Sequence, residues 1–134
     1  MIPEISKKFK VLKGYTIDNN VYRVLLSNEK STKFLSVTID CDNKKWNAKP
    51  LELKLKNESI IQSISHNNLL YLITVTKRTS NVNFYKFEKY LSYTKFTKDF
   101  KNLEYKSPSG FPYTALRSLE KDLLHLKLLL IFPK

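Results

Sequence analysis

Residues 67–88 read NNLLYLITVTKRTSNVNFYKFE, two runs rich in β-branched and aromatic side chains with a polar segment between them. Runs of this kind, bounded by asparagine and serine, are typical of antiparallel strands joined by short connections. Asn67 and Asn68 suit a tight hairpin, because asparagine tolerates the left-handed backbone conformation that such turns require. The stretch therefore predicts a turn, a strand over residues 69–76, a second turn and a strand over residues 82–87.

Residues 19–40, NNVYRVLLSNEKSTKFLSVTID, have the same organisation 48 positions earlier, and the two segments align without a gap. The aligned pairs include Asn19 with Asn67, Asn20 with Asn68, Val24 with Leu72, Leu25 with Ile73, Val37 with Tyr85 and Ile39 with Phe87. Repeats of about 40–50 residues in all-β sequences are the mark of propeller blades, which have four strands each. Chance similarity between two hairpins of equal length is the alternative, which the absence of gaps disfavours.

Residues 21–88 thus resemble the blades of β-propeller repeat proteins. The resemblance concerns the fold alone: the paired glycines of kelch repeats are absent, and Trp46 is followed by Asn47 rather than by the aspartate of WD repeats. Four such blades would need on the order of 180 residues, more than the 134 of this chain. The resemblance therefore implies an open or truncated propeller: either a piece of a larger repeat protein or an open sheet that another element covers.

Residues 9–88 as a whole predict one antiparallel meander of about six or seven strands, because short polar turns separate the apolar runs. Further strands are predicted over residues 21–26, 33–39, 51–56 and 60–64. In residues 51–56, LELKLK, leucines alternate strictly with charged side chains, which is the pattern of a half-buried strand. An open meander leaves edge strands that pair with other chains, so the sequence predicts a protein partner or self-association through a sheet edge.

The C-terminal part of the chain changes its hydrophobic period after the Gly- and Pro-containing residues 107–112. Leucines recur at spacings of three and four at positions 116, 119, 123, 126 and 130. This spacing predicts a helix over residues 113–131, ended by Pro133. Packing of this helix on the open face of the sheet is the simpler interpretation, and docking to a partner protein or a membrane surface is the alternative.

Residues 89–112 are predicted to form a connection rich in aromatic side chains and lysine, within a single domain that spans residues 1–134. Tyr90, Tyr93 and Phe96 are candidate aromatics for stacking on nucleic-acid bases, since bases stack on such rings beside lysines that bind phosphate. Tyr93, Phe96, Phe100 and Leu103 also fit one stripe of a helix. A core-facing stripe is the commoner reason for that spacing.

The chain carries 24 Lys and Arg against 12 Asp and Glu, a formal net charge of +12. The excess is spread evenly, and only Arg23, Arg78 and Arg117 are arginines, whereas readers of base sequence depend on arginine. The candidate surface for a polyanion consists of Lys54, Lys56, Lys86, Lys89, Lys95 and Lys98. Nucleic-acid binding without sequence specificity is therefore the alternative function.

Residues for catalysis, metal binding or cofactor binding form no recognisable pattern. Cys41 is the single cysteine, which excludes an internal disulfide, and His66 and His125 have no second ligand at metal-binding spacing. Asp40 to Asn43 read as an ordinary turn, because the glycine and distal glutamate of a calcium loop are missing. No enzyme activity and no cofactor are predicted.

No signal peptide or transmembrane segment is predicted, since the longest apolar stretch, residues 123–132, is about half the length that spans a bilayer. The expected location is the cytoplasm. The sequence thus predicts a mainly β protein with a C-terminal helix that acts as a non-catalytic binding or scaffold module for other proteins.

Overall fold

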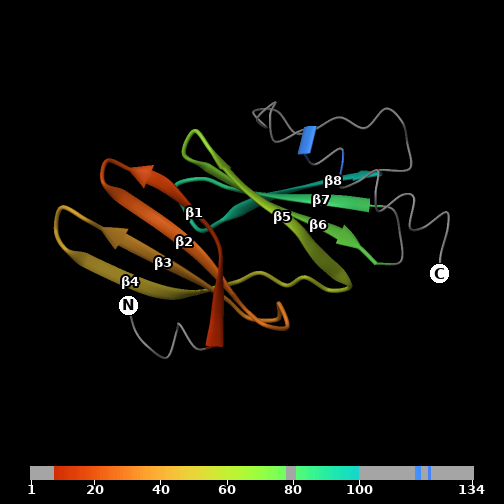
Figure 1. Cartoon of the computed structure of the whole chain (residues 1–134), viewed down its shortest axis with the longest axis horizontal. Helices are drawn as coiled ribbons and strands as arrows, with labels where there is room; N and C mark the ends of the chain where they lie inside the picture. Colours follow the sequence, from red (N-terminus) through yellow and green to blue (C-terminus); the bar gives the residue numbers. More distant parts are fainter. Residues whose placement is uncertain (1–7, 78–80, 100–116, 119–120, 122–134) are drawn as a thin grey trace.

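The computed structural model describes residues 8–77, 81–99, 117, 118 and 121. Within them the chain forms eight antiparallel strands in two four-stranded sheets, with strand orders β1-β2-β3-β4 and β5-β6-β7-β8. The first sheet consists of β1 (Phe9–Asp18), β2 (Val21–Asn28), β3 (Phe34–Asp40) and β4 (Lys45–Leu51). The second sheet consists of β5 (Glu58–His66), β6 (Leu69–Thr76), β7 (Asn81–Phe87) and β8 (Tyr93–Asp99). Figure 1 shows the first sheet in red to yellow and the second in green to teal. The prediction of a mainly β, antiparallel fold is confirmed.

Asparagine supplies most of the left-handed turn positions, as the sequence predicts. Asn20, Asn57, Asn67 and Asn68 all have positive φ angles, between 49° and 63°. Asn67 and Asn68 are the two central residues of the β5–β6 hairpin, a pattern that matches the type I′ turn. The other described residues with positive φ, Ser31 and Lys44, also lie between strands.

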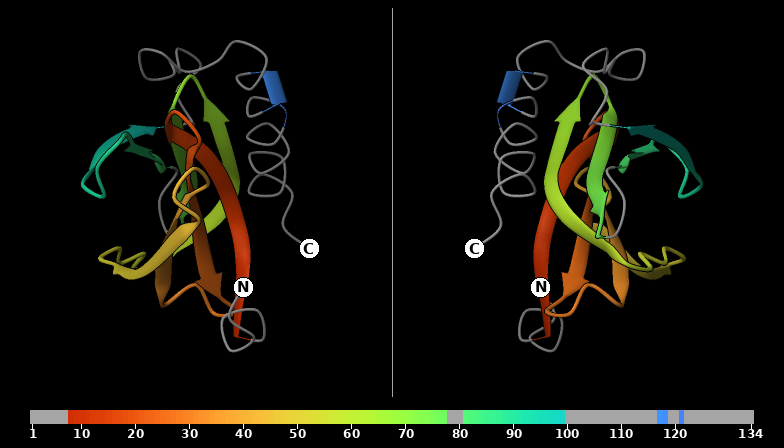
Figure 2. Two further views of the ribbon diagram at one scale, coloured as in Figure 1. Left: turned by 90° about the vertical axis from the view of Figure 1, so that its left-hand side faces the viewer. Right: turned by 90° about the vertical axis from the view of Figure 1, so that its right-hand side faces the viewer.

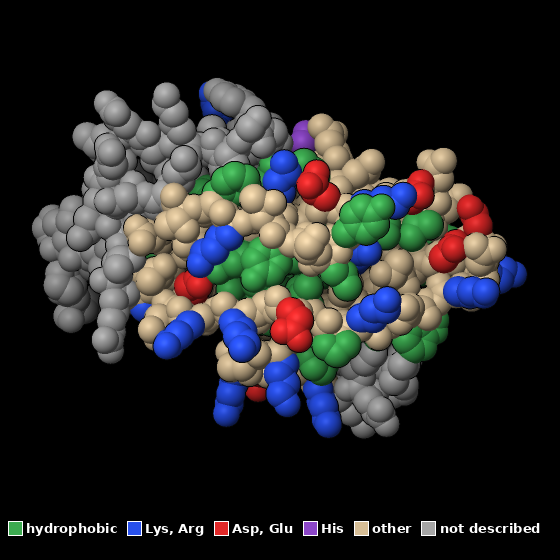
Figure 3. Space-filling view, turned by 180° about the vertical axis from the view of Figure 1, so that it is seen from behind, with side chains coloured by type: hydrophobic (Ala, Val, Ile, Leu, Met, Phe, Trp, Pro, Cys, Tyr) green, Lys and Arg blue, Asp and Glu red, His purple; other side chains and the backbone are tan. Residues whose placement is uncertain are grey.

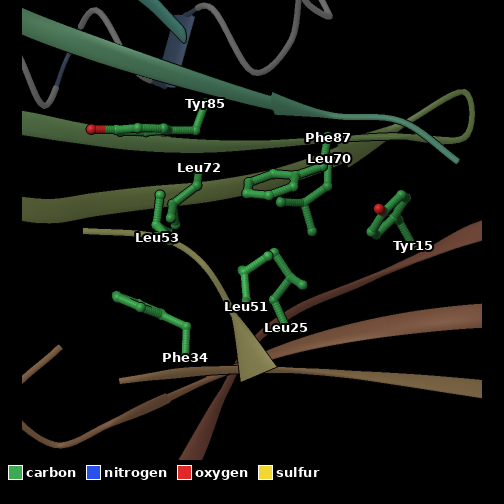
Figure 4. Close-up of a cluster of buried hydrophobic side chains, with 9 residues drawn as sticks. All are labelled: Tyr15, Leu25, Phe34, Leu51, Leu53, Leu70, Leu72, Tyr85 and Phe87. Carbon is green, nitrogen blue, oxygen red and sulfur yellow. The ribbon is translucent and has the colours of Figure 1, made fainter. Parts of the chain in front are cut away.

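The two sheets pack face to face around one hydrophobic core, shown in Figure 4. Each sheet contributes four of its buried side chains, and Leu53 of the connection between the sheets completes the cluster. The first sheet contributes Tyr15, Leu25, Phe34 and Leu51, and the second contributes Leu70, Leu72, Tyr85 and Phe87. We call the faces that carry these residues the inner faces of the two sheets. Every member of the cluster is at most 7% exposed.

The alternating segment of residues 51–56 is not a strand, so this prediction was wrong. Apart from Leu51 at the end of β4, it forms the connection between the two sheets. Leu51 and Leu53 are buried and Glu52 and Lys54 are exposed, as the alternation predicts, but the Leu53 amide donates to the Leu51 carbonyl oxygen (2.9 Å), a γ-turn. The meander predicted over residues 9–88 is therefore divided into two at this point.

The outer face of the second sheet carries a separate core. Tyr71, Ile73, Val82 and Phe84 are fully buried there, and Phe96 of β8 packs against them. Residues 93–99 thus belong to a strand, which corrects the helical stripe considered for Tyr93 and Phe96. Of the predicted C-terminal helix, only Arg117, Ser118 and Lys121 lie within the described residues, and Ser118 accepts a hydrogen bond from Gln62 of β5 (3.1 Å).

The first strands of the two sheets lie side by side, whereas their last strands lie apart. Both views in Figure 2 show β1 next to β5, and β1 is in contact with β5 and β6. The Ser63 hydroxyl of β5 donates a hydrogen bond to the Leu12 carbonyl oxygen of β1 (2.9 Å). In both views β4 and β8 point away from this junction.

A candidate protein-docking face on the first sheet

The outer face of the first sheet exposes a row of three large apolar side chains. Tyr22 of β2 pairs with Ile39 of β3, which pairs with Trp46 of β4, so the three lie next to one another across the strands. Their exposed fractions are 41%, 36% and 51%. Large contiguous apolar surfaces on soluble proteins mark sites of interaction.

The rest of the outer face is also apolar but less exposed, since Leu26 is only 4% exposed. The strand register places two further rows beside the first, Val24 with Val37 and Ala48, and Leu26 with Leu35 and Pro50. None of these nine side chains carries a charge. We call these nine residues the outer face of the first sheet.

A hollow of about 730 Å³ adjoins the outer face between the β5–β6 hairpin and the strands β1 and β2. Its lining consists of Gly14, Tyr15, Thr16, Tyr22 and Val24 from the first sheet and of Ser65, His66, Asn67 and Asn68 from the hairpin. The outer face of the first sheet is therefore bounded by polar hairpin residues along the side of β1. Such a border fits the common arrangement of an apolar centre with a polar rim in protein interfaces.

The residues that could support catalysis or metal binding are not gathered at this face. His66 is the one described histidine and lies in the wall of the hollow, while His125 is outside the described residues. Cys41 is exposed in the β3–β4 turn, where the Asp40 carboxylate accepts hydrogen bonds from the backbone and side chain of Asn43. Among the described residues no group of three or more potential metal ligands is found.

The lysines of the candidate polyanion surface are distributed over different parts of the molecule. Lys54 and Lys56 lie on the connection between the sheets, Lys86 lies on the outer face of the second sheet, and Lys95 lies on its inner face. Lys89 pairs with Asp18 (3.5 Å) and Lys95 with Glu58 (3.8 Å). The side chain of Lys98 is outside the described part. Figure 3 shows basic side chains along one border of its view, with acidic side chains among them.

The three candidate stacking aromatics do not share a surface. Tyr93 packs on the intersheet core, 5.3 Å from the Tyr85 ring and 5.4 Å from the Phe87 ring. Phe96 packs on the opposite core. Tyr90 is 73% exposed and is the one of the three that is free to stack on a base. For Tyr93 and Phe96 the structure shows packing against the protein core.

A buried polar cluster spans all four strands of the second sheet. The Glu58 carboxylate of β5 accepts hydrogen bonds from the Thr74 hydroxyl (2.5 Å) and from the Tyr85 hydroxyl (2.7 and 2.9 Å). Asn83 donates to Thr74 (3.2 Å) and accepts from Thr97 (2.9 Å). The Glu58 side chain is only 7% exposed, and Lys95 covers it while its ammonium lies 5.3 Å from the centre of the Tyr85 ring. Each acceptor and donor has a partner, so the cluster joins the four strands rather than offering reactive groups to a substrate.

Three buried tyrosines predict a loss of stability in alkaline solution. Burial raises the pKa of Tyr85, with the Glu58 carboxylate adding to the effect, and burial likewise raises the pKa of Tyr15 and Tyr71. Tyrosines in the unfolded chain lose their protons near pH 10, before those in the folded protein. The stability that these groups contribute is thus complete below about pH 10 and declines above it, by up to about 1.4 kcal/mol per pH unit for each group.

Urea unfolding at a series of pH values between about 8 and 11 measures this decline. Tyr85→Phe removes one of the three groups, so its stability is expected to fall less steeply with pH than that of the unmodified protein. An equal slope for the two proteins would contradict the assignment of this pH dependence to Tyr85.

Arg23 is a buried cation with no acidic partner among the described residues. It is 7% exposed on the inner face of β2, and its Nη1 donates to the carbonyl oxygens of Lys89 (2.7 Å) and Glu88 (3.4 Å) and to the Tyr15 hydroxyl (3.1 Å). Its Nε is buried without a hydrogen-bond partner. Arg23 therefore attaches the two residues that follow β7 to the first sheet through their backbone carbonyls.

The apolar outer face of the first sheet is not among the candidate surfaces predicted from the sequence, although a signal for it exists. Residues 21–26, VYRVLL, place apolar side chains on both faces of β2. A strand with apolar side chains on both faces is usually covered on both sides. Within the described residues, Tyr22 is the member of this segment that stays exposed on the outer face.

No helix in the described part of the chain is long and apolar enough to cross a membrane. Comparisons of the chain with protein-family models, with curated proteins and with solved structures find no match.

Proposed function

We propose that the protein is a non-catalytic β-sheet binding or scaffold module that docks another protein on the outer face of its first sheet. The row of Tyr22, Ile39 and Trp46 is the observation that carries this proposal. Tyrosine and tryptophan are the residues that most often supply binding energy at the centre of protein interfaces. An uncharged face also avoids the cost of removing water from charged groups on binding.

A propeller-like origin of the two sheets supports the same function. Each sheet is a four-stranded meander, β2 begins at Val21 and β6 at Leu69, 48 positions later, and the first strands of both sheets lie together. In this proposal the two sheets are treated as consecutive blades, since each blade of a propeller is a four-stranded sheet. With two sheets in the described part of the chain, the outer face of the first sheet has no neighbouring sheet there and is available to a partner.

Photo-crosslinking in cells that make the protein tests the proposed function. Benzoylphenylalanine placed at position 22 is expected to form a covalent adduct with a protein, because this side chain would lie in the interface. The same group at position 90 is the matched control, since Tyr90 is also an exposed aromatic but follows β7 and lies off the outer face. Absence of an adduct at position 22, or equal adducts at both positions, would contradict the proposal.

Ile39→Lys places a charge at the centre of the row and is expected to abolish the adduct formed from position 22. A desolvated lysine without a partner costs several kcal/mol in an interface. Because Ile39 is 36% exposed in the free chain, the variant can keep its ammonium in water and its free energy of unfolding should change by less than about 1 kcal/mol. Urea denaturation checks the stability, and an adduct that persists in the variant would exclude this face.

A further inference from the structure

The inner face of the second sheet and the outer face of the first sheet occupy equivalent positions in the repeat. The inner face of the second sheet presents Leu70, Leu72, Tyr85 and Phe87, all at most 1% exposed. The residues 48 positions earlier are Tyr22, Val24, Val37 and Ile39. These four lie on the outer face of the first sheet, where Tyr22 and Ile39 are exposed. The equivalent positions are thus fully covered in the second sheet, whereas two of the four are exposed in the first.

The remaining two faces are equivalent in the same way. Tyr71, Ile73, Val82 and Phe84 form the outer core of the second sheet. The residues 48 positions earlier are Arg23, Leu25, Phe34 and Ser36, which are buried on the inner face of the first sheet. The two sheets are therefore stacked head to tail: one kind of face on the first sheet contacts the other kind on the second.

A head-to-tail contact differs from a two-fold symmetric one because it leaves one face of each kind without a counterpart at the ends of the stack. At the end formed by the second sheet, all four side chains of the unmatched face are fully buried. At the end formed by the first sheet, the unmatched face exposes Tyr22, Ile39 and Trp46. The stack is thus open at the first sheet.

We propose that the outer face of the first sheet receives a further four-stranded sheet of the same repeat type, laid on the first sheet as the first sheet lies on the second. This inference rests on the proposed function and names the occupant of its docking face. The contact would continue the interface that the molecule already contains, with a face like that of Leu25 and Phe34 placed against Tyr22 and Ile39.

A second copy of this chain does not fit as the occupant. Of the two faces of the required kind that it has, one is covered within the intersheet core, where Leu25 and Phe34 are at most 4% exposed. The other is the fully buried cluster that contains Tyr71 and Phe84. The net charge of +12 also opposes the association of identical chains. The further sheet must therefore be one whose matching face is free.

The experiment supplies such a sheet by fusing a second copy of residues 8–57 in front of the full chain. In the added copy Trp46→Phe leaves the original Trp46, on the docking face, as the one tryptophan of the fusion. If the added sheet stacks on this face, the emission of Trp46 moves to shorter wavelength and its quenching by acrylamide falls severalfold. The urea m-value also rises by roughly a third, in proportion to the added folded surface.

The control is the same fusion with Ile39→Lys in the original first sheet, which is expected to restore the emission and the m-value of the unfused chain. Unchanged Trp46 emission in the fusion, or unfolding of the added copy in a separate transition, would overturn the inference. If the fusion is insoluble, the unmodified chain provides the test. The inference then requires that this chain sediments as a monomer at all concentrations up to about 0.2 mM.

A dimer of the unmodified chain that Ile39→Lys dissociates would show that a second copy occupies the face. Such a dimer would overturn the inference while leaving the proposed function intact. The converse outcome is that the added sheet stacks on Trp46 in the fusion while no crosslink forms from position 22 in cells. That pair of results would count against the proposed function alone.

Discussion

Glu58→Ala is expected to lower the free energy of unfolding by about 3 kcal/mol, since it removes a charged acceptor from two buried hydroxyl groups. The Tyr85 hydroxyl donates to both carboxylate oxygens, and Tyr85 is 1% exposed, so water does not replace the lost partner. Thr74, which is fully buried, also loses its acceptor. Urea denaturation of the variant measures the loss.

Two further variants show whether hydrogen bonding is the cause. Glu58→Gln keeps one acceptor oxygen and should cost about half as much as alanine. In the double variant Glu58→Ala with Tyr85→Phe, no buried hydroxyl is left at position 85, so the two losses should be less than additive by about 1–3 kcal/mol. Fully additive losses would show that the carboxylate and the tyrosine do not stabilise the fold as a pair.

The hairpins of this fold follow from local chemistry, which is why the sequence predicts them well. β6 has the predicted bounds, Leu69–Thr76, because a run of β-branched and aromatic residues follows two asparagines that take the left-handed conformation. The division into two sheets is different. This division depends on whether each segment forms hydrogen bonds with a neighbouring strand. The alternation of residues 51–56 indicates only which side chains are buried.

β4 was not among the predicted strands, for a related reason. β4, with the sequence KWNAKPL, contains two lysines, an asparagine and a proline, residue types that are depleted in strands. An edge strand needs only one partner, and lysine and proline at an edge hinder pairing with other chains. Its composition therefore reflects its position at the edge rather than a lack of β-structure.

The candidate nucleic-acid surface was predicted from spacings that place side chains differently in a helix and in a strand. Tyr93 and Phe96 are three residues apart, which places them on one side of a helix but on opposite faces of a strand. In β8 they pack on two different cores. The same rule places Lys86 and Lys95 on opposite faces. Lys95 pairs with Tyr85 and shares its face, and Lys86, the next residue after Tyr85, points to the other face. Composition alone could not assign these side chains to a common surface.

Phe87→Ala is expected to have the largest effect of any single substitution considered, a loss of about 3–5 kcal/mol. Phe87 is fully buried in the intersheet core, and its ring lies 5.4 Å from that of Tyr93. Its removal leaves a cavity between two sheets whose backbones are fixed by their own strand pairing. The urea midpoint should fall while the m-value stays constant.

Ile39→Ala is the matched control, because Ile39 stands at the equivalent position of the first sheet, 48 residues earlier. In the free chain its side chain is 36% exposed, so the loss should stay near 1 kcal/mol. In the fusion that adds a further sheet, the same substitution in the original first sheet should lower the free energy of unfolding by about 2–5 kcal/mol, as for any covered core isoleucine. The rise in cost from the free chain to the fusion thus measures how completely the added sheet covers the docking face. A cost that stays the same would mean that the equivalence of Ile39 and Phe87 ends at the sequence and does not extend to packing.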